Sequence, residues 1–315
     1  MGTLQRGLKS GFQTTWELGK IIFPITLAVT ILRYTPVLEW LIHFIAPVMK
    51  WLGLSGEAAI PLVLGNFLNL YAGIGAILTL DLSVKEVFIL AVMLSFSHNL
   101  LIESSVAARV GVKLWVMFAV RIGLAFISAI VINLVWQGGS EQAAYGFISQ
   151  SSETVNGWGA IILQGLEKAS FGVLQLALIV IPLMIFIQVM KDFSWLHTFS
   201  RWMGPVTRSL GMKENTSTTL AAGLIFGLAY GSGVMIQAVK EDGVGKKDRY
   251  LAFIFLVACH AVIEDTLIFI PLGIPVIWLL VVRLVTAVLL TLIISVIWKR
   301  REISASERKE PFYEH

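Results

Sequence analysis

The sequence predicts an all-α, polytopic integral membrane protein with two inverted-topology repeats, each containing a glycine-broken helix that can be re-entrant. Two observations carry this prediction. Of the 315 residues, 57% are hydrophobic and only 14% are charged, whereas a soluble domain carries about 25% charged residues. In addition, a glycine-rich stretch and the apolar segment that follows it occur twice. Together these features indicate membrane-embedded helices arranged in two related halves.

The internal repeat is visible in glycine, histidine, acidic, arginine and tryptophan positions. The stretch from Gly65 to Gly75 matches the stretch from Gly223 to Gly233, which lies 158 residues later. After four extra residues within 240–249 the separation becomes 162. The pairs matched at that separation are His98 with His260, Glu103 with Asp265, Arg121 with Arg283, and Trp136 with Trp298. Chance does not account for this many matches at fixed separations, so the chain contains a duplication.

The first repeat is expected at 1–136. The segments expected there are a span at 12–32, an amphipathic helix at 36–52, a glycine-broken segment at 58–80, and spans at 87–107 and 114–136. The spans approach or exceed the roughly 20 apolar residues that a bilayer requires. Glu39, His43 and Lys50 interrupt the segment at 36–52, which favours a helix lying in the membrane interface.

The rest of the chain repeats this plan after a polar external linker at 137–167. The second repeat, at 168–298, is expected to contain spans at 171–190, 250–270 and 276–298, an amphipathic helix at 195–210, and a broken segment at 218–239. The charged residues of 299–315 predict a disordered cytoplasmic tail.

The distribution of Lys and Arg predicts the orientation, because cytoplasmic loops are enriched in these residues. Arg6 and Lys9 precede the first span, and a basic run starts at Lys299, which places both termini on the cytoplasmic side of a bacterial cell membrane. The linker carries Glu141 and Glu153 and is expected outside. Each half then crosses an odd number of times, so the halves are inverted relative to each other.

The glycine pairs Gly73/Gly75 and Gly231/Gly233 are expected to break their helices. Broken helices expose backbone groups at membrane depth, which is tolerated where they line a wet cavity. The substrate-binding residues predicted around the breaks are Asn66, Asn69, Tyr71, Gly73 and Gly75 in the first copy, and Tyr230, Gly231, Ser232, Gly233 and Gln237 in the second. Neutral donors and acceptors of this kind suit an uncharged polar solute. The alternative is that the glycines allow close helix packing.

A second group of candidates is ionisable and lies midway along predicted spans, where charged groups are costly and usually functional. The group predicted as a proton-coupling or polar centre is His98, Glu103, His260, Glu264 and Asp265. His260 and Glu264 would share a face of an intact helix, whereas His98 and Glu103, five residues apart, would not.

Other interpretations of these residues stay open. The histidines can instead bond neighbouring helices. Arg121 and Arg283 are expected to pair with Glu103 and Asp265. A metal site is also conceivable, although no compact ligand spacing such as HExxH appears, so metal ligands stay undetermined. The candidate ligands are His98, His260, Glu264, Asp265, Cys259 and Met235.

These features resemble a known family. The Tyr-Ala-Gly-Ile-Gly stretch from Tyr71 and the Tyr-Gly-Ser-Gly stretch from Tyr230, each followed by a histidine and an acid, resemble the Gate or nucleoside-recognition domain. That domain occurs in concentrative nucleoside transporters, in the membrane part of FeoB-type ferrous-iron transporters, and in spore-maturation proteins A and B. The resemblance covers most of 12–298.

The resemblance implies a membrane transporter for a nucleoside-like or other small polar solute, with proton coupling through the histidines as a hypothesis. The alternatives are a divalent-metal permease and a non-transporting membrane partner protein of the spore-maturation type. No enzyme, cofactor or nucleic-acid partner is expected, because no nucleophile-base spacing appears and the net charge of +4 comes from basic residues at segment ends. The expected partners are the solute and the lipid bilayer, with a homo-oligomer or a second membrane protein left open.

Overall fold

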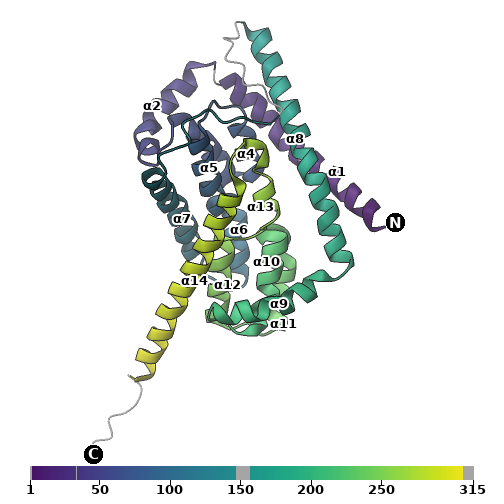
Figure 1. The fold of residues 1–315 in the computed structure, drawn as a ribbon, viewed down its shortest axis with the longest axis vertical. Helices are drawn as coiled ribbons and strands as arrows, with labels where there is room; N and C mark the ends of the chain where they lie inside the picture. The colour runs from purple at the N-terminus through teal and green to yellow at the C-terminus, as the bar shows by residue number, and fades with distance from the viewer. Residues whose placement is uncertain (1, 33, 147–156, 308–315) are drawn as a thin grey trace, which may run out of the picture.

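The structure is a computed structural model that describes residues 2–32, 34–146 and 157–307 (Figure 1). Helices and the loops between them make up these residues, which confirms the all-α prediction. The first half contains α1 (Thr3–Leu32), α2 (Pro36–Trp51), the 3-10 turn η1 (Gly56–Ala58), α3 (Ala59–Phe67), α4 (Leu70–Ile77), α5 (Val84–Ser97), α6 (Leu100–Arg109) and α7 (Leu114–Val135).

The second half has the same order of elements. It contains α8 (Trp158–Asp192), α9 (Trp195–Ser209), η2 (Glu214–Thr216), α10 (Ser217–Tyr230), α11 (Ser232–Glu241), α12 (Lys246–Ala258), α13 (Glu264–Leu267), η3 (Ile270–Leu272) and α14 (Val276–Glu307). Several expected boundaries differ, and α1 begins at Thr3 rather than at residue 12. Helix α8 begins inside the expected linker, and α14 continues into the expected disordered tail. The parts of the linker and tail at 147–156 and 308–315 lie outside the described residues.

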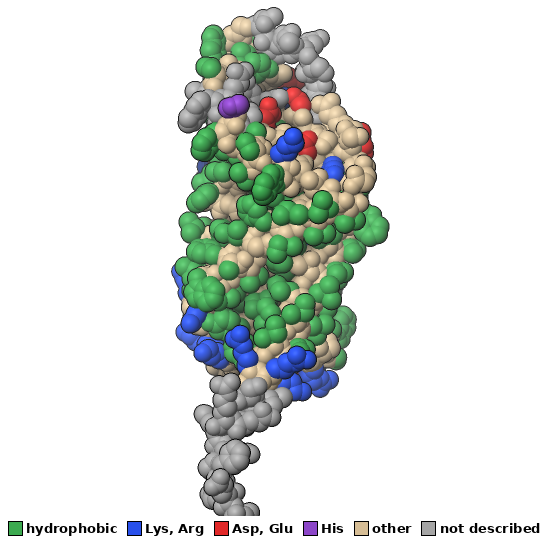
Figure 2. Space-filling view, turned by 90° about the vertical axis from the view of Figure 1, so that its left-hand side faces the viewer, with side chains coloured by type: hydrophobic (Ala, Val, Ile, Leu, Met, Phe, Trp, Pro, Cys, Tyr) green, Lys and Arg blue, Asp and Glu red, His purple; other side chains and the backbone are tan. Residues whose placement is uncertain are grey.

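Five helical segments of the described chain are long and apolar enough to cross a membrane: Thr3–Leu32, Val84–Arg109, Leu114–Val135, Trp158–Asp192 and Val276–Glu302. The segment Val84–Arg109 is central, because 78% of its apolar window is buried by protein, against 22% for Leu114–Val135. The expected span at 250–270 is divided into α12 and α13. A broad belt of hydrophobic side chains faces outward (Figure 2). The chain is therefore a polytopic membrane protein.

The helix breaks lie earlier than the glycine pairs predicted. Gly73 and Gly75 lie inside α4, whereas the chain leaves helical geometry at Leu68 and resumes it after an extended Asn69. In the second half the break is at Gly227, whose φ of 74° and ψ of 179° suit glycine alone. Asn69 and Gly227 are 158 residues apart, so the breaks are equivalent. The glycine-rich pattern correctly predicted which segments are broken, but it placed each break at the wrong residues, because a glycine can also lie within a regular, packed helix.

Contacts between α1 and α8 recur in matched pairs. A Cβ atom on Gly7 would lie 2.7 Å from Ile185 Cα, and one on Gly165 would lie 2.7 Å from Leu27 Cδ1. Gly7 and Gly165 are 158 residues apart, as are Leu27 and Ile185. The small glycines allow the two helices to approach closely. Each half therefore presents the same surface to the other, as in a twofold-symmetric contact.

The two ends of the molecule are marked by different loops. At one end, Arg249 donates to the Val110 carbonyl at 2.6 Å, so the turn between α6 and α7 adjoins the start of α12. At the other end, a Cβ on Gly273 would lie 2.5 Å from the Ala144 carbonyl oxygen, so the turn before α14 adjoins the segment 137–146. Helix α9 lies at the first end and α2 at the other (Figure 1).

Candidate functional site

The site forms where two central helices are interrupted at equivalent points. Helix α5 ends at His98 and α6 begins after Asn99, which has a left-handed φ of 50°. Helix α12 ends before Cys259, and Ala261 has a φ of 41°. The interruptions are held by equivalent backbone bonds, since Asn99 N–H donates to the Gly65 carbonyl at 2.8 Å and Ala261 N–H to the Gly223 carbonyl at 3.0 Å. Gly65 and Gly223 have no side chain, which leaves room for the two segments of the backbone to approach each other.

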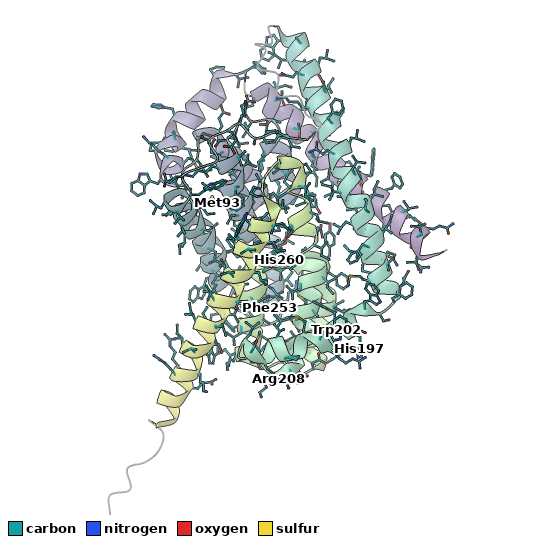
Figure 3. All side chains as sticks on the ribbon, viewed as in Figure 1. Met93, His197, Trp202, Arg208, Phe253 and His260 are labelled. Carbon is teal, nitrogen blue, oxygen red and sulfur yellow. The ribbon has the colours of Figure 1, made fainter. Side chains whose placement is uncertain are left out.

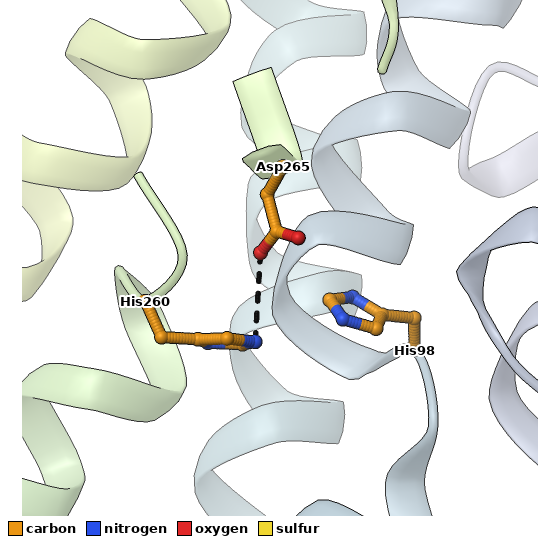
Figure 4. A group of neighbouring side chains, drawn as sticks. All are labelled: His98, His260 and Asp265. Atoms are coloured by element: carbon orange, nitrogen blue, oxygen red, sulfur yellow. Dashed lines mark ion pairs between the residues drawn. The ribbon is translucent and has the colours of Figure 1, made fainter. Parts of the chain in front are cut away.

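The two interruptions bring His98 and His260 face to face. Their ring centroids are 5.3 Å apart, with 37° between the ring planes, and His260 lies near the middle of the molecule (Figures 3 and 4). Each ring contacts the main-chain carbonyl four residues earlier through Nδ1. The distances are 2.6 Å to Leu94 for His98 and 2.8 Å to Leu256 for His260. Both Nε2 atoms are therefore directed away from these carbonyls and towards the acidic residues of the site.

Two buried arginines fix the acidic residues. Arg121 donates to Glu103 at 2.8 Å and Arg283 donates to Asp265 at 2.9 Å. Each arginine also donates to the carbonyl of the histidine in its own half. This pairing was expected from sequence and is confirmed. Because an unpaired buried charge is costly, each guanidinium holds both its carboxylate and the interrupted backbone in place.

The histidines contact the carboxylates within each half, and His260 also contacts Glu103 of the other half. His98 Nε2 lies 3.3 Å from Glu103 Oε1, and His260 Nε2 lies 3.3 Å from Glu103 Oε2 and 3.5 Å from Asp265 Oδ2. The helical spacing argument is wrong here. His98 and Glu103 do meet, because the chain between them is not helical, and His260 and Glu264 do not share one continuous helix.

Tyr71 and Glu264 add a further link between the halves. Tyr71, from α4, is 8% exposed and donates a hydrogen bond to the Glu264 carboxylate, from α13. These two residues, the histidines and the acids line a central cavity of about 270 Å³. The cavity thus has both imidazoles, four carboxylates, including that of Glu17, and the phenols of Tyr71 and Tyr230 on its walls.

A second cavity, of about 480 Å³, leads from the centre toward one end of the molecule. It shares Phe226, Tyr230 and Glu264 with the central cavity and extends past Met184 to His197 on α9. His197 lies at the lower end of the molecule in Figure 3. The central cavity is therefore continued on the side where α9 lies.

The predicted neutral residues are divided between the cavity and other places. Asn69, Tyr71 and Tyr230 line the central cavity, where Asn69 also caps α4 by accepting from Ala72 N–H at 2.9 Å. The other predicted residues lie elsewhere. Asn66 donates to the Leu62 carbonyl, and Gly73 and Gly75 pack within the first half. Gly231 and Ser232 join α10 to α11, and Gly233 and Gln237 are exposed.

Sequence reasoning missed Asn99, Phe226 and Gly227, which also line the central cavity. Gly227 could have been found as the residue equivalent to Asn69. Cys259 is buried but is not in the group of His98, His260 and Asp265 whose ligand atoms lie within 4.8 Å of one another. That group was not visible as a sequence motif because its members come from separate interrupted helices.

Comparison with known proteins supports the assignment of the two halves. Residues 15–112 and 173–281 match the Gate family, described as nucleoside recognition. The chain belongs to the Gate family. The two matched segments begin 158 residues apart, in agreement with the duplication.

A Gate relative is known in Bacillus subtilis (strain 168). It is an uncharacterized membrane protein, YvoD, with 66% identity over 299 residues, covering 95% of this chain and 96% of the relative. No solved structure matches the chain.

Proposed function

We propose that this Gate protein is a transporter of a small polar solute that works by alternating access between two inverted repeats. The proposal rests mainly on one asymmetry between equivalent residues. A Cβ on Gly75 would lie 3.1 Å from Thr26 Oγ1 and 3.2 Å from Ile22 Cγ2, whereas a Cβ on Gly233 would have nothing within 4 Å. Helix α4 is therefore closed onto α1 in the first half, whereas the equivalent helix α11 is apart from α8 in the second half.

The inversion of the halves is supported by the contacts that recur at fixed separations. The turn after α6 and the turn after α13 are equivalent in sequence but adjoin opposite ends of the molecule, beside Arg249 and Ala144 respectively. The paired glycine contacts of α1 and α8 require an axis that exchanges these ends. Transporters with inverted repeats place their solute between the halves, near mid-membrane.

The closed side involves α1 and α4. Thr26 donates to the Gly75 carbonyl at 3.2 Å, and Ile22 is buried against the same helix. The residues equivalent to Ile22 and Thr26 are Val180 and Met184 on α8, and both line the open cavity instead. Closing α8 onto α11 around Gly233, and parting α1 from α4, would open the opposite end.

The open cavity is expected to face the cytoplasm. Lys and Arg side chains gather at the end of the molecule where α9 lies, and acidic side chains are seen toward the other end (Figure 2). Arg201, Lys213 and Lys246 belong to the basic end. The positive-inside rule supports a cytoplasmic position for this end, and we propose that both termini lie on the cytoplasmic side of a bacterial cell membrane. The structure is then the inward-facing state.

Thiol labelling tests the proposal with a matched pair of positions. Val234 lines the open cavity and is 38% exposed, whereas its equivalent Ala76 is completely buried. Single cysteines are introduced at each in a Cys259→Ala background, which removes the only native thiol. Membrane-impermeant maleimide is added to inside-out and right-side-out vesicles, with and without uridine, adenosine or Zn²⁺.

At rest, Val234→Cys should react in inside-out vesicles and Ala76→Cys should stay protected in both orientations. A transported probe should change both rates, with Ala76→Cys becoming reactive in right-side-out vesicles. A reactive Ala76→Cys that appears only in inside-out vesicles would contradict the inverted arrangement. If all probes leave both rates unchanged while Val234→Cys reacts on both sides, the protein is a pore or a partner protein rather than this transporter.

A further inference from the structure

The orientation of the two central imidazoles is fixed by the backbone. A main-chain carbonyl only accepts hydrogen bonds, so the contacts of Nδ1 with Leu94 and Leu256 place a hydrogen on Nδ1 in both rings. In a neutral imidazole the other nitrogen then carries a lone pair. Both Nε2 lone pairs are presented to the cavity. A histidine that donates its second ring nitrogen to a carbonyl is the usual arrangement of a metal ligand.

The groups facing these lone pairs are also acceptors. His260 Nε2, in a residue only 1% exposed, makes no hydrogen bond, yet it lies 3.3 Å from Glu103 and 3.5 Å from Asp265. Carboxylate oxygens and imidazole lone pairs repel one another unless a positive centre lies between them. A cation shared by these acceptors would remove this repulsion.

The spacing of the acceptor atoms fits such a cation. The donor atoms of His98, His260 and Asp265 all lie within 4.8 Å of one another (Figure 4). A tetrahedral ion with bonds of about 2.0–2.2 Å separates its ligand atoms by roughly 3.3–3.6 Å. The contact of His260 with Asp265, at 3.5 Å, is already in this range, and so are the two 3.3 Å contacts of Glu103 with the rings.

We propose that His98, His260 and Asp265 bind a divalent first-row transition-metal ion, with Glu103 as the nearest fourth ligand. The formal charges favour this. The carboxylates of Glu103, Glu264 and Asp265 outnumber the two guanidiniums of Arg121 and Arg283, so the site carries one negative charge with neutral histidines. Arg121 and Arg283 donate to Glu103 Oε2 and Asp265 Oδ2, the same oxygens that contact His260 Nε2. A hydrogen-bond donor on a ligating carboxylate is the role that second-shell groups have in metal sites.

The ligand types indicate which cations bind. Two imidazoles with one or two carboxylates suit Zn²⁺, Fe²⁺, Co²⁺ or Mn²⁺, whereas Mg²⁺ and Ca²⁺ prefer oxygen ligands alone. The inference names the solute class of the proposed transporter, and it rests on that proposal for the movement of the ion. The binding site itself stands on the geometry of the side chains.

Metal binding to the purified full-length protein tests the inference. The protein is prepared in detergent with a tag that contains no histidine, treated with a chelator, and titrated with Zn²⁺ by calorimetry. Co²⁺ is added in parallel, because its visible absorption reports tetrahedral nitrogen and oxygen ligands. The variants are His98→Gln, His260→Gln and Asp265→Asn, with His43→Gln as the control, since His43 is exposed on α2.

The expected result is about one Zn²⁺ per chain and a tetrahedral Co²⁺ spectrum. Zn²⁺ affinity should fall more than tenfold in each ligand variant, because loss of a second-shell group alone already costs about tenfold or more. Zn²⁺ affinity should be unchanged in His43→Gln. Mg²⁺ should not compete. If a variant fails to fold, the Co²⁺ spectrum of the unaltered chain and the Asp265→Asn variant carry the test.

Absence of Zn²⁺ and Co²⁺ binding to the unaltered chain would overturn the inference, and protons on the Nε2 atoms would then occupy the position assigned to the ion. Binding that persists unchanged in both histidine variants would also overturn it. Neither result bears on the thiol-labelling pattern of Val234→Cys and Ala76→Cys. Failure of the metal site is thus distinguishable from failure of the transport proposal.

Discussion

Tyr71 on α4 donates a hydrogen bond to Glu264 on α13, and this bond joins the two halves across the central cavity. Tyr71 is buried and Glu264 is partly buried, so an unpaired Glu264 would keep part of its desolvation penalty. Tyr71→Phe should therefore lower the free energy of unfolding by about 1–3 kcal/mol. Tyr34→Phe is the control, because Tyr34 is exposed and bonds Gln164.

A double-mutant cycle isolates this bond. Tyr71→Phe and Glu264→Leu are combined, and the stability of the four proteins is measured by thermal denaturation in detergent. The two changes should be less than additive, because each alone already removes the bond. Strict additivity would show that Tyr71 and Glu264 are neighbours without energetic coupling.

The buried arginines give a second prediction. Arg283 is fully buried and holds both Asp265 and the His260 carbonyl. Arg283→Met leaves Asp265 unpaired and should destabilise the protein by about 3–5 kcal/mol. Adding Asp265→Asn should recover part of this loss, since the unpaired charge is then absent.

The control for Arg283 is Arg208. Arg208 pairs with Glu214 at 3.0 Å, but both side chains are more than half exposed. Arg208→Met should leave the denaturation temperature nearly unchanged, because exposed ion pairs contribute little. Equal effects of the two substitutions would mean that the central ion pairs do not organise the site.

The backbone break in the second half gives a third prediction. Gly227 has a φ of 74°, and a Cβ there would lie 3.1 Å from the Ala261 Cβ. Gly227→Ala should cost about 1–3 kcal/mol of stability through backbone strain. Gly233→Ala, in a helix with nothing within 4 Å, should be neutral or slightly stabilising. Comparable losses in both variants, measured by chemical or thermal denaturation, would argue against a strained break at Gly227.

Much of the fold could be predicted from sequence because membrane helices have a strong signal. Apolar length located α1, α7 and α14, and the fixed separation between His98 and His260 revealed two halves. The helix ends were harder. Helix α14 runs to Glu307 because charged residues extend a helix readily beyond an apolar segment.

The site could be predicted only in part. The ionisable residues were found because buried charges are rare in membrane spans. Their geometry was not, since helical spacing separates His98 from Glu103 whereas the interrupted backbone brings them to 3.3 Å. An interruption of this kind is set by tertiary contacts, such as the bond from Asn99 N–H to the Gly65 carbonyl, which no local pattern contains.

The open interface around Gly233 gives the fourth prediction and the most direct test of alternating access. Gly233→Cys is combined with Met184→Cys, the equivalents of Gly75 and Thr26, in a Cys259→Ala background. A disulfide needs Cβ atoms about 3.5–4.5 Å apart. A Cβ on Gly233 would have nothing within 4 Å, so it makes no contact with Met184, whereas a Cβ on Gly75 would lie 3.1 Å from Thr26 Oγ1.

The decisive measurement is oxidation of both cysteine pairs to disulfides in membranes, with and without Zn²⁺ or uridine. Thr26→Cys/Gly75→Cys should cross-link at rest. Met184→Cys/Gly233→Cys should cross-link only when the opposite state is populated, and either link should block uptake until it is reduced. Uptake that continues with the Thr26–Gly75 link complete, or a Met184–Gly233 link that never forms while solute moves, would contradict alternating access.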